Sequence, residues 1–216
     1  MILQLPDAEA GRQIAPTVAA HLAREGLIAY PTETVYGLGS APSDGGLDAL
    51  ARLKGRPPRK PFLLLDSVFE MLQSTGLALN ASARAMAREF WPGALTLVLP
   101  GGEGRLPARL RGAEGGIAVR WTSHVALAAM IKAIGTPITS TSANRPGGPP
   151  APGVDGIVSL FGEAITRGEL LVIDGGVLGN VPPSTLVDCT TAVPRLVREG
   201  AIPRAELRRR VGRLAP

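Results

Sequence analysis

Apolar and polar positions follow two patterns along the chain, and each recurs from one end to the other. Apolar residues three or four positions apart, such as Ile14, Val18 and Leu22, are typical of the buried face of a helix. Short apolar runs, such as residues 62–65, are typical of a buried strand. Because helical and strand segments follow one another in turn, the pattern predicts an α/β protein.

Capping residues and the apolar pattern together set the expected elements. Asp7 is expected to cap the first helix, which ends before Gly26, and Asn80 to cap another. Helices are expected over residues 8–25, 45–53, 68–72 after a cap at Ser67, 81–90, 124–134 after a cap at Thr122 or Ser123, 154–161 and 203–213. Strands are expected over residues 27–30, 62–65, 95–99, 117–120, 136–140, 170–173, 186–188 and 193–197. Residues 101–116, rich in Gly and Arg, predict a surface loop or hairpin.

The length of 216 residues allows one large α/β domain or two small ones. Because no linker, internal repeat or low-complexity segment interrupts the pattern, we expect a single domain over residues 1–216, with a core at about 11–202 and an arginine-rich helix at 203–213. No apolar run is long enough to span a bilayer, and residues 1–6 do not begin a secretory signal. A single cysteine, Cys189, fits a reducing cytoplasm, where we expect the protein to act.

Nucleophilic and metal chemistry find little support in the sequence. The two histidines, His21 and His124, are far apart, and no Cys/His cluster has the spacing of zinc ligands. No nucleophile-elbow pattern is present, although a Ser-His-Asp triad assembled in space stays open from spacing alone. We therefore expect no metal site made by the protein, and hydrolysis by covalent catalysis is not favoured.

The most concentrated basic stretch is Lys54 to Lys60, which reads Lys-Gly-Arg-Pro-Pro-Arg-Lys. Its consecutive prolines fix φ and remove backbone donors, so the stretch cannot continue a helix. It joins an expected helix to an expected core strand, which favours a rigid cationic loop that holds an anion. The net charge of +5 agrees with a phosphate or nucleic-acid ligand. On charge alone, the alternative is a solvated basic turn.

Polar side chains gather where several expected strands end. Residues 31–39 (PTETVYGLG) and 139–144 (TSTSAN) each follow or finish a strand, and Arg120 ends another. In open α/β sheets ligands bind beyond strand ends. The planar guanidinium of an arginine can bind a carboxylate or a phosphate through two N–H groups. Ordinary turns and a surface ion pair are the alternatives.

Together these features predict one cleft along one edge of a mixed sheet, lined with positive charge and hydroxyl groups. Such a cleft suits a nucleoside triphosphate and a small polar acid. Neither a P-loop nor a dinucleotide fingerprint is present. We expect any Mg²⁺ to be held mainly by the phosphates of ATP and by water, because no acidic cluster offers a protein cage.

Several motifs carry a family resemblance. Residues 31–38 resemble the opening signature of the YrdC/TsaC family, the L-threonylcarbamoyladenylate synthases, and Lys54-x-Arg56 with Ser142-x-Asn144 resembles the paired motif of that family. Similar family elements match residues 91–93, 118–120, 184–185 and 198–200. The resemblance covers about residues 11–202.

The resemblance implies a twisted mixed sheet flanked by helices around a positively charged cavity. It implies a nucleotidyltransferase that converts L-threonine, bicarbonate or CO₂, and ATP into L-threonylcarbamoyl-AMP and pyrophosphate. The product would supply a threonylcarbamoyl transferase complex that modifies the tRNA adenosine next to the anticodon.

The resemblance also implies roles for individual residues. Lys54 and Arg56 are the expected catalytic residues. The expected ATP-binding residues are Lys54, Arg56, Lys60, Ser142, Asn144 and Arg198. The expected L-threonine-binding residues are Thr32, Thr34, Arg120, Ser140 and Ser184.

Some positions depart from the family pattern. Lys60 and Leu65 stand where longer members often carry Asn and His, so the chain resembles the short, single-domain form. His124 lacks the proline that often precedes the matching histidine, and we expect it to support its loop. Two alternative functions stay open: a module that binds tRNA or double-stranded RNA without turnover, and a carbamoyl-adenylate-forming domain with a different acceptor, as in hydrogenase maturation proteins.

Overall fold

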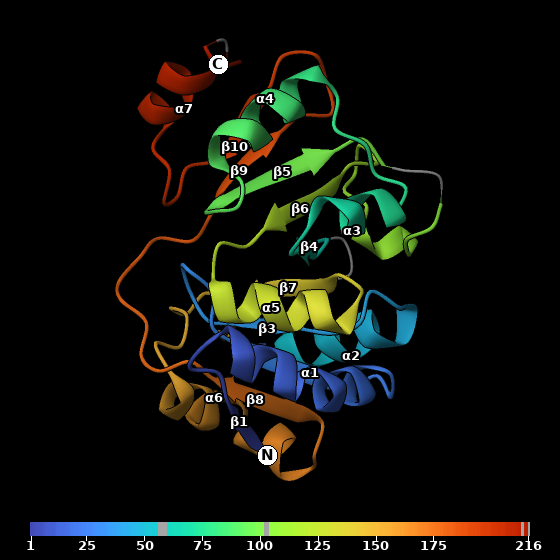
Figure 1. The fold of residues 1–216 in the computed structure, drawn as a ribbon, viewed down its shortest axis with the longest axis vertical. Coiled ribbons are helices and arrows are strands. Elements are labelled where there is room, and N and C mark those ends of the chain that lie inside the picture. Colours follow the sequence, from blue (N-terminus) through green and yellow to red (C-terminus); the bar gives the residue numbers. More distant parts are fainter. Residues whose placement is uncertain (56–59, 102–103, 213, 216) are drawn as a thin grey trace.

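In the computed structural model, which describes residues 1–55, 60–101, 104–212 and 214–215, ten strands form one mixed sheet (Figure 1). Their order across the sheet is β1-β8-β2-β3-β7-β4-β6-β5-β9-β10. The strands are β1 (Ile2–Gln4), β2 (Leu27–Tyr30), β3 (Gly37–Gly39), β4 (Leu63–Asp66), β5 (Leu95–Leu99), β6 (Ile117–Trp121), β7 (Ile138–Ser142), β8 (Leu170–Asp174), β9 (Thr185–Asp188) and β10 (Arg195–Arg198). The predicted α/β class and mixed open sheet are confirmed.

The sheet contains both parallel and antiparallel pairs. β1, β8 and β2 are parallel, β3 and β7 lie antiparallel to their neighbours in the middle, and β4 pairs parallel with β6. β5 then pairs antiparallel with β6 and parallel with β9. As a result, segments that begin some strands and end others lie next to one another.

Helices cover the sheet on both faces, and the described residues bury two apolar clusters between them. The helices are α1 (Ala8–Leu22), α2 (Asp44–Lys54), α3 (Phe69–Ser74), α4 (Ala81–Phe90), a 3₁₀ turn (Ala108–Leu110), α5 (Val125–Ile134), α6 (Val154–Thr166) and α7 (Arg204–Val211). α1 and α5 pack side by side over one cluster (Figure 1). Their closeness requires Gly11, because a Cβ there would lie 2.4 Å from the carbonyl oxygen of Ala126.

The capping predictions are partly confirmed. The carboxylate of Asp7 accepts from the N–H of Ala10, and the Asn80 amide oxygen accepts from that of Ala83. The predicted cap at Ser67 is wrong, because α3 begins two residues later, after Val68, without a side-chain cap. The predicted cap of α5 at Thr122 or Ser123 is also wrong. His124 caps this helix, and its ring nitrogen Nδ1 accepts from the N–H of Leu127.

Several strand predictions shift. β7 begins at Ile138 and continues to Ser142, so the hydroxyl-bearing segment belongs to the strand and not to a following turn. Its threonines are β-branched and suit a pleated strand. β1 and β3 were not expected, because β1 is exposed at both ends and β3 is the short segment Gly-Leu-Gly without an apolar run. α6 extends beyond the predicted 161 to Thr166, across a kink at Phe161.

The single cysteine of the chain lies in the core. Cys189 is fully buried, and burial, with the neighbouring Asp188 charge, raises the pKa of its thiol to about 12, so it is not a nucleophile at neutral pH. Within the described part of the chain, none of the helices combines the length and the apolar character that crossing a bilayer requires.

A buried carboxyl at the end of β4 gives a prediction about stability. Asp66 is 2% exposed, and its Oδ1 has no hydrogen-bond partner among the described residues. Burial raises its pKa from 3.8 to about 7. Since the folded state keeps this proton longer than the unfolded chain does, stability should fall from about pH 4 to about pH 7, by about 4 kcal/mol at most. Asp66→Asn should remove this fall, as measured by urea unfolding across that range.

Asp188→Asn is the matched control, with the opposite sign. Burial favours the neutral form of Asp188, but hydrogen bonds from Thr190 and the Arg195 guanidinium outweigh it and lower the pKa. This carboxylate stabilises the fold above its unfolded pKa, and the contribution is lost as pH falls. The control should therefore destabilise the protein at neutral pH. An unchanged pH dependence in Asp66→Asn would contradict the prediction.

Candidate functional site

The residues singled out from the sequence converge on a cavity of about 370 Å³. Its lining includes these predicted site residues: Thr32, Thr34, Lys60, Arg120, Ser140, Ser142, Ser184 and Arg198. Lys54 and Asn144 contact Ser142 but are not part of the lining. Arg56 lies outside the described residues. The structure thus brings together, from distant parts of the chain, most of the predicted set.

The cavity lies over a face of the sheet, and the predicted position along one edge is wrong. Alternate residues of single strands line it, namely Ala118 and Arg120 of β6 and Thr96 and Val98 of β5. Alternate residues of a strand project to the same face. In a mixed sheet, residues from the start of one strand and the end of the next can meet on such a face. The prediction of an edge site relied on the rule that ligands bind beyond the ends of parallel strands.

The segment 31–36 after β2 forms a turn held by one hydroxyl. Thr32 Oγ1 accepts from the backbone N–H groups of Thr34, at 3.1 Å, and Val35, at 3.2 Å, and donates to the carbonyl of Val35 at 2.7 Å. The side-chain oxygen therefore replaces backbone partners that a regular element would supply. This turn places the Thr34 hydroxyl against the end of β6.

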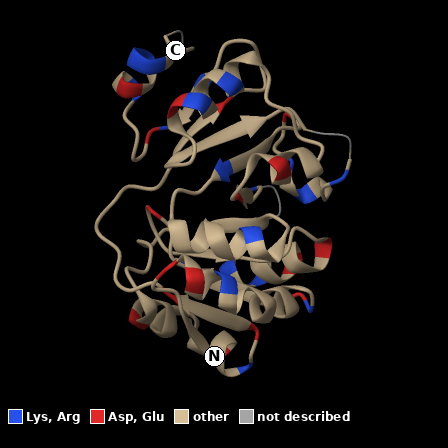
Figure 2. Cartoon of the chain, viewed as in Figure 1, with Lys and Arg blue, Asp and Glu red and all other residues tan. Residues whose placement is uncertain are grey.

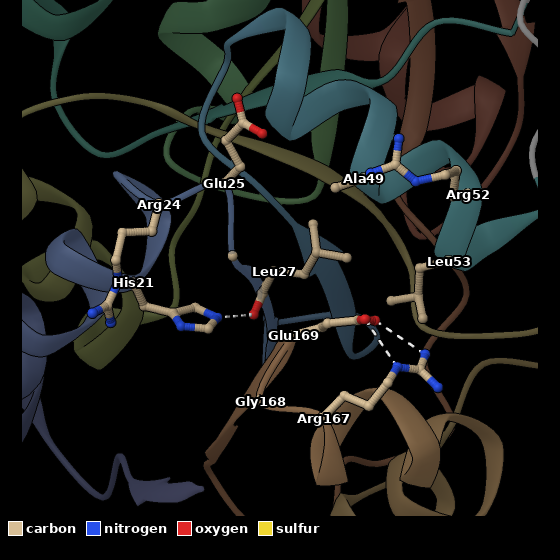
Figure 3. Close-up of a pocket in the computed structure, with 11 residues that line it drawn as sticks. His21, Arg24, Glu25, Leu27, Ala49, Arg52, Leu53, Arg167, Gly168 and Glu169 are labelled. Atoms are coloured by element: carbon tan, nitrogen blue, oxygen red, sulfur yellow. Dashed lines mark hydrogen bonds and ion pairs between the residues drawn. The ribbon is translucent and has the colours of Figure 1, made fainter.

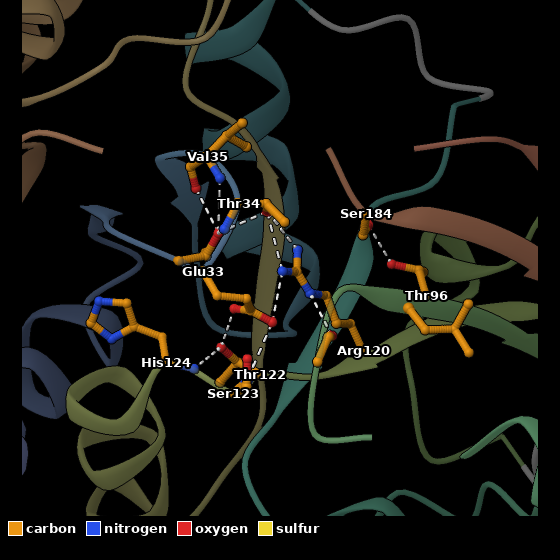
Figure 4. Close-up of polar contacts among 12 residues, drawn as sticks. Glu33, Thr34, Val35, Thr96, Arg120, Thr122, Ser123, His124 and Ser184 are labelled. Atoms are coloured by element: carbon orange, nitrogen blue, oxygen red, sulfur yellow. Dashed lines mark hydrogen bonds and ion pairs between the residues drawn. The ribbon is translucent and has the colours of Figure 1, made fainter. Parts of the chain in front are cut away.

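Arg120 is the centre of the polar network in Figure 4 and is only 5% exposed. Its Nη1 and Nη2 each donate to Thr34 Oγ1 at 3.1 Å, and Nη2 forms an ion pair of 2.8 Å with Glu33 Oε1. Its Nε donates to the carbonyl of Gly93 at 3.3 Å. Within the described residues, Nη1 makes only the bond to Thr34, so one of its two hydrogens is not used. Arg120 is thus fixed in place beside the cavity.

Glu33 is the functional residue of this network that the sequence reasoning did not assign. Besides Arg120, it accepts from the Thr122 hydroxyl at 2.7 Å and from the Ser123 N–H at 3.2 Å (Figure 4). Burial by itself would raise its pKa, but the Arg120 charge and the hydrogen bonds outweigh burial and hold the pKa below 4.5. The signal in the sequence was a carboxylate in a strand-end loop together with a strand-end arginine that needed a counter-charge.

Lys54 joins helix α2 to the segment after β7. Its ammonium donates to the carbonyl of Ser142 at 2.5 Å, to that of Asn144 at 2.6 Å, and to Asn144 Oδ1. Asn144 Oδ1 also accepts from the Ser142 hydroxyl at 2.7 Å, and its Nδ2 donates to the carbonyl of Gly148. The two halves of the paired motif are therefore in direct contact. Lys54 shapes the 142–144 segment, and its predicted contact with phosphate stays a prediction.

The far side of the cavity is built by β5, β9 and β10. Ser184 Oγ and Thr96 Oγ1 lie 2.7 Å apart, and Arg198 Nη2 donates to the carbonyl of Ser184 at 2.7 Å. Partial burial and the nearby charge of Arg120 lower the pKa of Arg198. The two guanidinium groups therefore act on the same region, where an anion relieves their repulsion.

The hydroxyl of Thr185 connects two motifs near the end of the chain. It accepts from the N–H groups of Gly200 and Ile202 and donates to the carbonyl of Ile202. At Gly200 only a glycine fits, because a Cβ would lie 2.1 Å from the carbonyl oxygen of Pro183. The resulting close approach holds Arg198 beside Ser184.

Cations and hydroxyls, and not a metal-ligand cluster, define the chemistry of this cavity. The charged side chains in its described lining are Lys60, Arg120 and Arg198. Among the described residues, no three or more His, Cys, Asp or Glu side chains gather as a metal site would require. Such a lining can bind anions and stabilise negative charge that develops during a reaction.

A larger cavity of about 630 Å³ lies elsewhere, between the end of α1, helix α2 and the turn before β8 (Figure 3). Several of its polar groups contact one another: Arg167 pairs with Glu169 at 2.9 Å, and His21 Nε2 lies 3.0 Å from the carbonyl oxygen of Leu27. None of the predicted site residues that the structure describes lines it. The smaller cavity is therefore the candidate site.

Comparison with known proteins finds similar sequences and similar structures. Residues 20–200 match the protein-family model Sua5_yciO_yrdC, described as telomere recombination. The threonylcarbamoyl-AMP synthase of Thiobacillus denitrificans is 40% identical over 185 residues, which cover 85% of this chain and 95% of that protein. The solved structure of P. abyssi Sua5 complexed with L-threonine matches with a TM-score of 0.85 at 30% identity, over 99% of this chain and 62% of that one. E. coli YciO matches with a TM-score of 0.76 at 27% identity, over 93% and 95% of the two chains.

The ion pair at the site leads to a prediction about stability. Glu33→Gln should destabilise the fold by about 3 kcal/mol at neutral pH, because it leaves the Arg120 charge buried without compensation. Since the Glu33 pKa is lowered, its contribution is present above the unfolded pKa and is lost as pH falls through the folded value. The variant should therefore lose less stability on acidification than the wild type, as measured by denaturant unfolding at several pH values.

Glu9→Gln is the matched control. Its carboxylate also pairs with an arginine, Arg12 at 2.7 Å, but both side chains are more than half exposed. Exposed pairs contribute little, so this variant should unfold almost as the wild type does. Equal effects of the two substitutions would contradict the role assigned to the buried pair.

Proposed function

Because the chain belongs to the Sua5/YciO/YrdC family, we propose that it is a threonylcarbamoyl-AMP synthase. It would convert L-threonine, bicarbonate or CO₂, and ATP into L-threonylcarbamoyl-AMP and pyrophosphate. The observation that carries the proposal is that one cavity is lined by the 31–36 turn, the Ser142 segment, Ser184 and three cationic side chains. The T. denitrificans relative is named for this product, and P. abyssi Sua5 was solved with L-threonine.

The reaction needs positioning and charge stabilisation more than a protein nucleophile. The amine of threonine captures CO₂ as a carbamate, and a carbamate oxygen attacks the α-phosphate of ATP in line while pyrophosphate leaves. Negative charge then develops on the α-phosphate and on the leaving group. Cationic groups fixed before the substrates bind stabilise that charge without reorganisation. The cavity supplies such groups, and we propose that its net charge is positive.

The two substrates would occupy different parts of the cavity. Arg120 and Thr34, with Thr32, Ser140 and Ser184, would hold L-threonine, and the guanidinium would face its carboxylate. Lys60, Ser142 and Arg198 would hold ATP, with Arg56 as a further phosphate ligand. Lys54 and Asn144 would act indirectly, because their hydrogen bonds fix the segment 142–144 that carries Ser142. Mg²⁺ would be bound mainly by the phosphates of ATP and by water, because Glu33 is already paired with Arg120.

The product would feed a tRNA threonylcarbamoyl transferase complex, and we propose that the protein works in the cytoplasm. The named relatives favour this synthase over a module that only binds RNA, and favour threonine as the acceptor. The arginines of α7 give limited support to RNA binding: Arg209 and Arg210 both pair with Glu206 of the same helix. Figure 2 shows that basic and acidic residues are interspersed on α4 and α7.

The test is pyrophosphate release from ATP and bicarbonate, with and without L-threonine. Lys54→Ala and Arg56→Ala should each lower the threonine-dependent rate by about 100-fold or more, because each removes a group that shapes or charges the phosphate side. Arg52→Ala is the control, since Arg52 lies on the same helix as Lys54 but is exposed and lines the larger cavity. It should keep the wild-type rate.

Three results would contradict the proposal. Release that L-threonine does not stimulate, in a folded protein that binds structured RNA, would favour the RNA-binding module. Stimulation by a different acceptor but not by threonine would favour another carbamoyl-adenylate former. Loss of activity in Arg52→Ala with full activity in Lys54→Ala would move the site to the larger cavity.

A further inference from the structure

Thr96 is a polar residue within the apolar run of β5. Its neighbours Leu95 and Leu97 are fully buried in the core, whereas the Thr96 side chain faces the cavity and is only 2% exposed. In the register of β5 with β6, Thr96 lies directly opposite Arg120. Side chains of such a pair have Cβ atoms about 5 Å apart. Thr96 therefore lies beside Arg120 on the face of the sheet that lines the cavity.

The hydroxyl of Thr96 forms a pair with that of Ser184, 2.7 Å away, in which either can be the donor (Figure 4). Each hydroxyl carries one hydrogen, so their bond uses one and leaves one. Within the described residues, neither hydroxyl has another hydrogen-bond partner. A buried donor without an acceptor is unfavourable, and both side chains line the cavity. The remaining hydrogen is thus available to a ligand there.

The surroundings of this hydroxyl pair suit an anion with two acceptor oxygens. Arg198 contacts the backbone of Ser184, and Arg120 lies opposite Thr96. Among the described residues, Nη1 of Arg120 donates only to Thr34, which leaves one of its two hydrogens for a ligand. Together with one hydroxyl hydrogen, it provides two donors, which match the two oxygens of a carboxylate. A triphosphate, with more charge and more oxygens, would leave most of its acceptors unmatched at this position.

We propose that Thr96 is a positioning residue for the amino-acid substrate: it holds the Ser184 hydroxyl so that the pair presents one hydrogen to the substrate carboxylate beside Arg120. The inference rests on the proposed function and adds to it a residue that the family motifs did not indicate. Thr96 acts through Ser184, so removing either hydroxyl should weaken the same interaction.

The experiment compares the kinetics of Thr96→Val, Thr96→Ser, Ser184→Ala and the double variant Thr96→Val/Ser184→Ala. Thr96→Val removes the hydroxyl and should raise the KM for L-threonine by about tenfold, the effect expected for one lost hydrogen bond to a charged group, with the KM for ATP unchanged. Thr96→Ser keeps the hydroxyl and should restore the wild-type KM. The double variant should be no worse than Ser184→Ala, because both substitutions remove one interaction.

Thr75→Val is the matched control for loss of a buried threonine hydroxyl. Thr75 is 6% exposed, and its hydroxyl donates to the carbonyl of Leu72, away from the cavity. This variant should keep the wild-type KM for both substrates. Calorimetric titration with L-threonine alone gives a second readout that does not depend on turnover, and its Kd should rise in Thr96→Val as the KM does.

The outcomes separate the inference from the proposed function. A wild-type protein that neither binds L-threonine nor uses it would overturn both. Threonine-dependent turnover with a wild-type KM in Thr96→Val would overturn the inference alone. A rise in the KM for ATP and not for threonine would place phosphate at this position, and failure of Thr96→Ser to restore the KM would show that packing of the side chain, not its hydroxyl, matters.

Discussion

The site depends on one buried ion pair, that of Arg120 with Glu33. Arg120 is 5% exposed, and its buried charge needs a counter-charge and hydrogen-bond acceptors. Here they come from the 31–36 turn and the carbonyl of Gly93. Glu33 in turn binds the residues that precede α5, Thr122 and Ser123. The Arg120–Glu33 pair therefore connects three stretches of the chain: the 31–36 turn, Gly93 and the residues before α5. Breaking the pair leaves a buried charge, so these stretches keep their relative positions before any substrate arrives.

The mixed sheet explains why residues so far apart in sequence meet. β3 and β7 lie antiparallel in the middle, so the start of β3 and the end of β7 lie side by side, with Gly37 opposite Ser142. β5 and β6 are antiparallel as well, which sets Thr96 of one strand opposite Arg120 of the other. An all-parallel sheet would gather only strand ends. This sheet also brings strand starts to the site, and the cavity spreads over a face.

Local signals in the sequence were enough for much of the fold and for the motif residues. Asp7 and Asn80 cap their helices, and residues 95–99 form a strand, because each depends on neighbours in the chain. The misses depend on distant partners. The Thr122 hydroxyl donates to Glu33 and accepts from the N–H of His124, and His124 is the residue that caps α5. Thr96 was not singled out, because its neighbours in the strand are apolar. Which face of β5 meets the cavity is decided by pairing with β6 and β9, which no short window of sequence contains.

The Lys54 contact gives a physical meaning to the spacing of the paired motif. An ammonium has three hydrogens, and here they are directed at the carbonyls of Ser142 and Asn144 and at the Asn144 amide oxygen. One residue between Ser142 and Asn144 lets both carbonyls face the same cation. The lysine therefore orders a segment whose Ser142 lines the cavity, while Lys60 and Arg198 lie in the lining itself. Some cations of this site therefore hold its walls together, and others line the cavity. A rigid arrangement of both is what electrostatic stabilisation of a charged transition state requires.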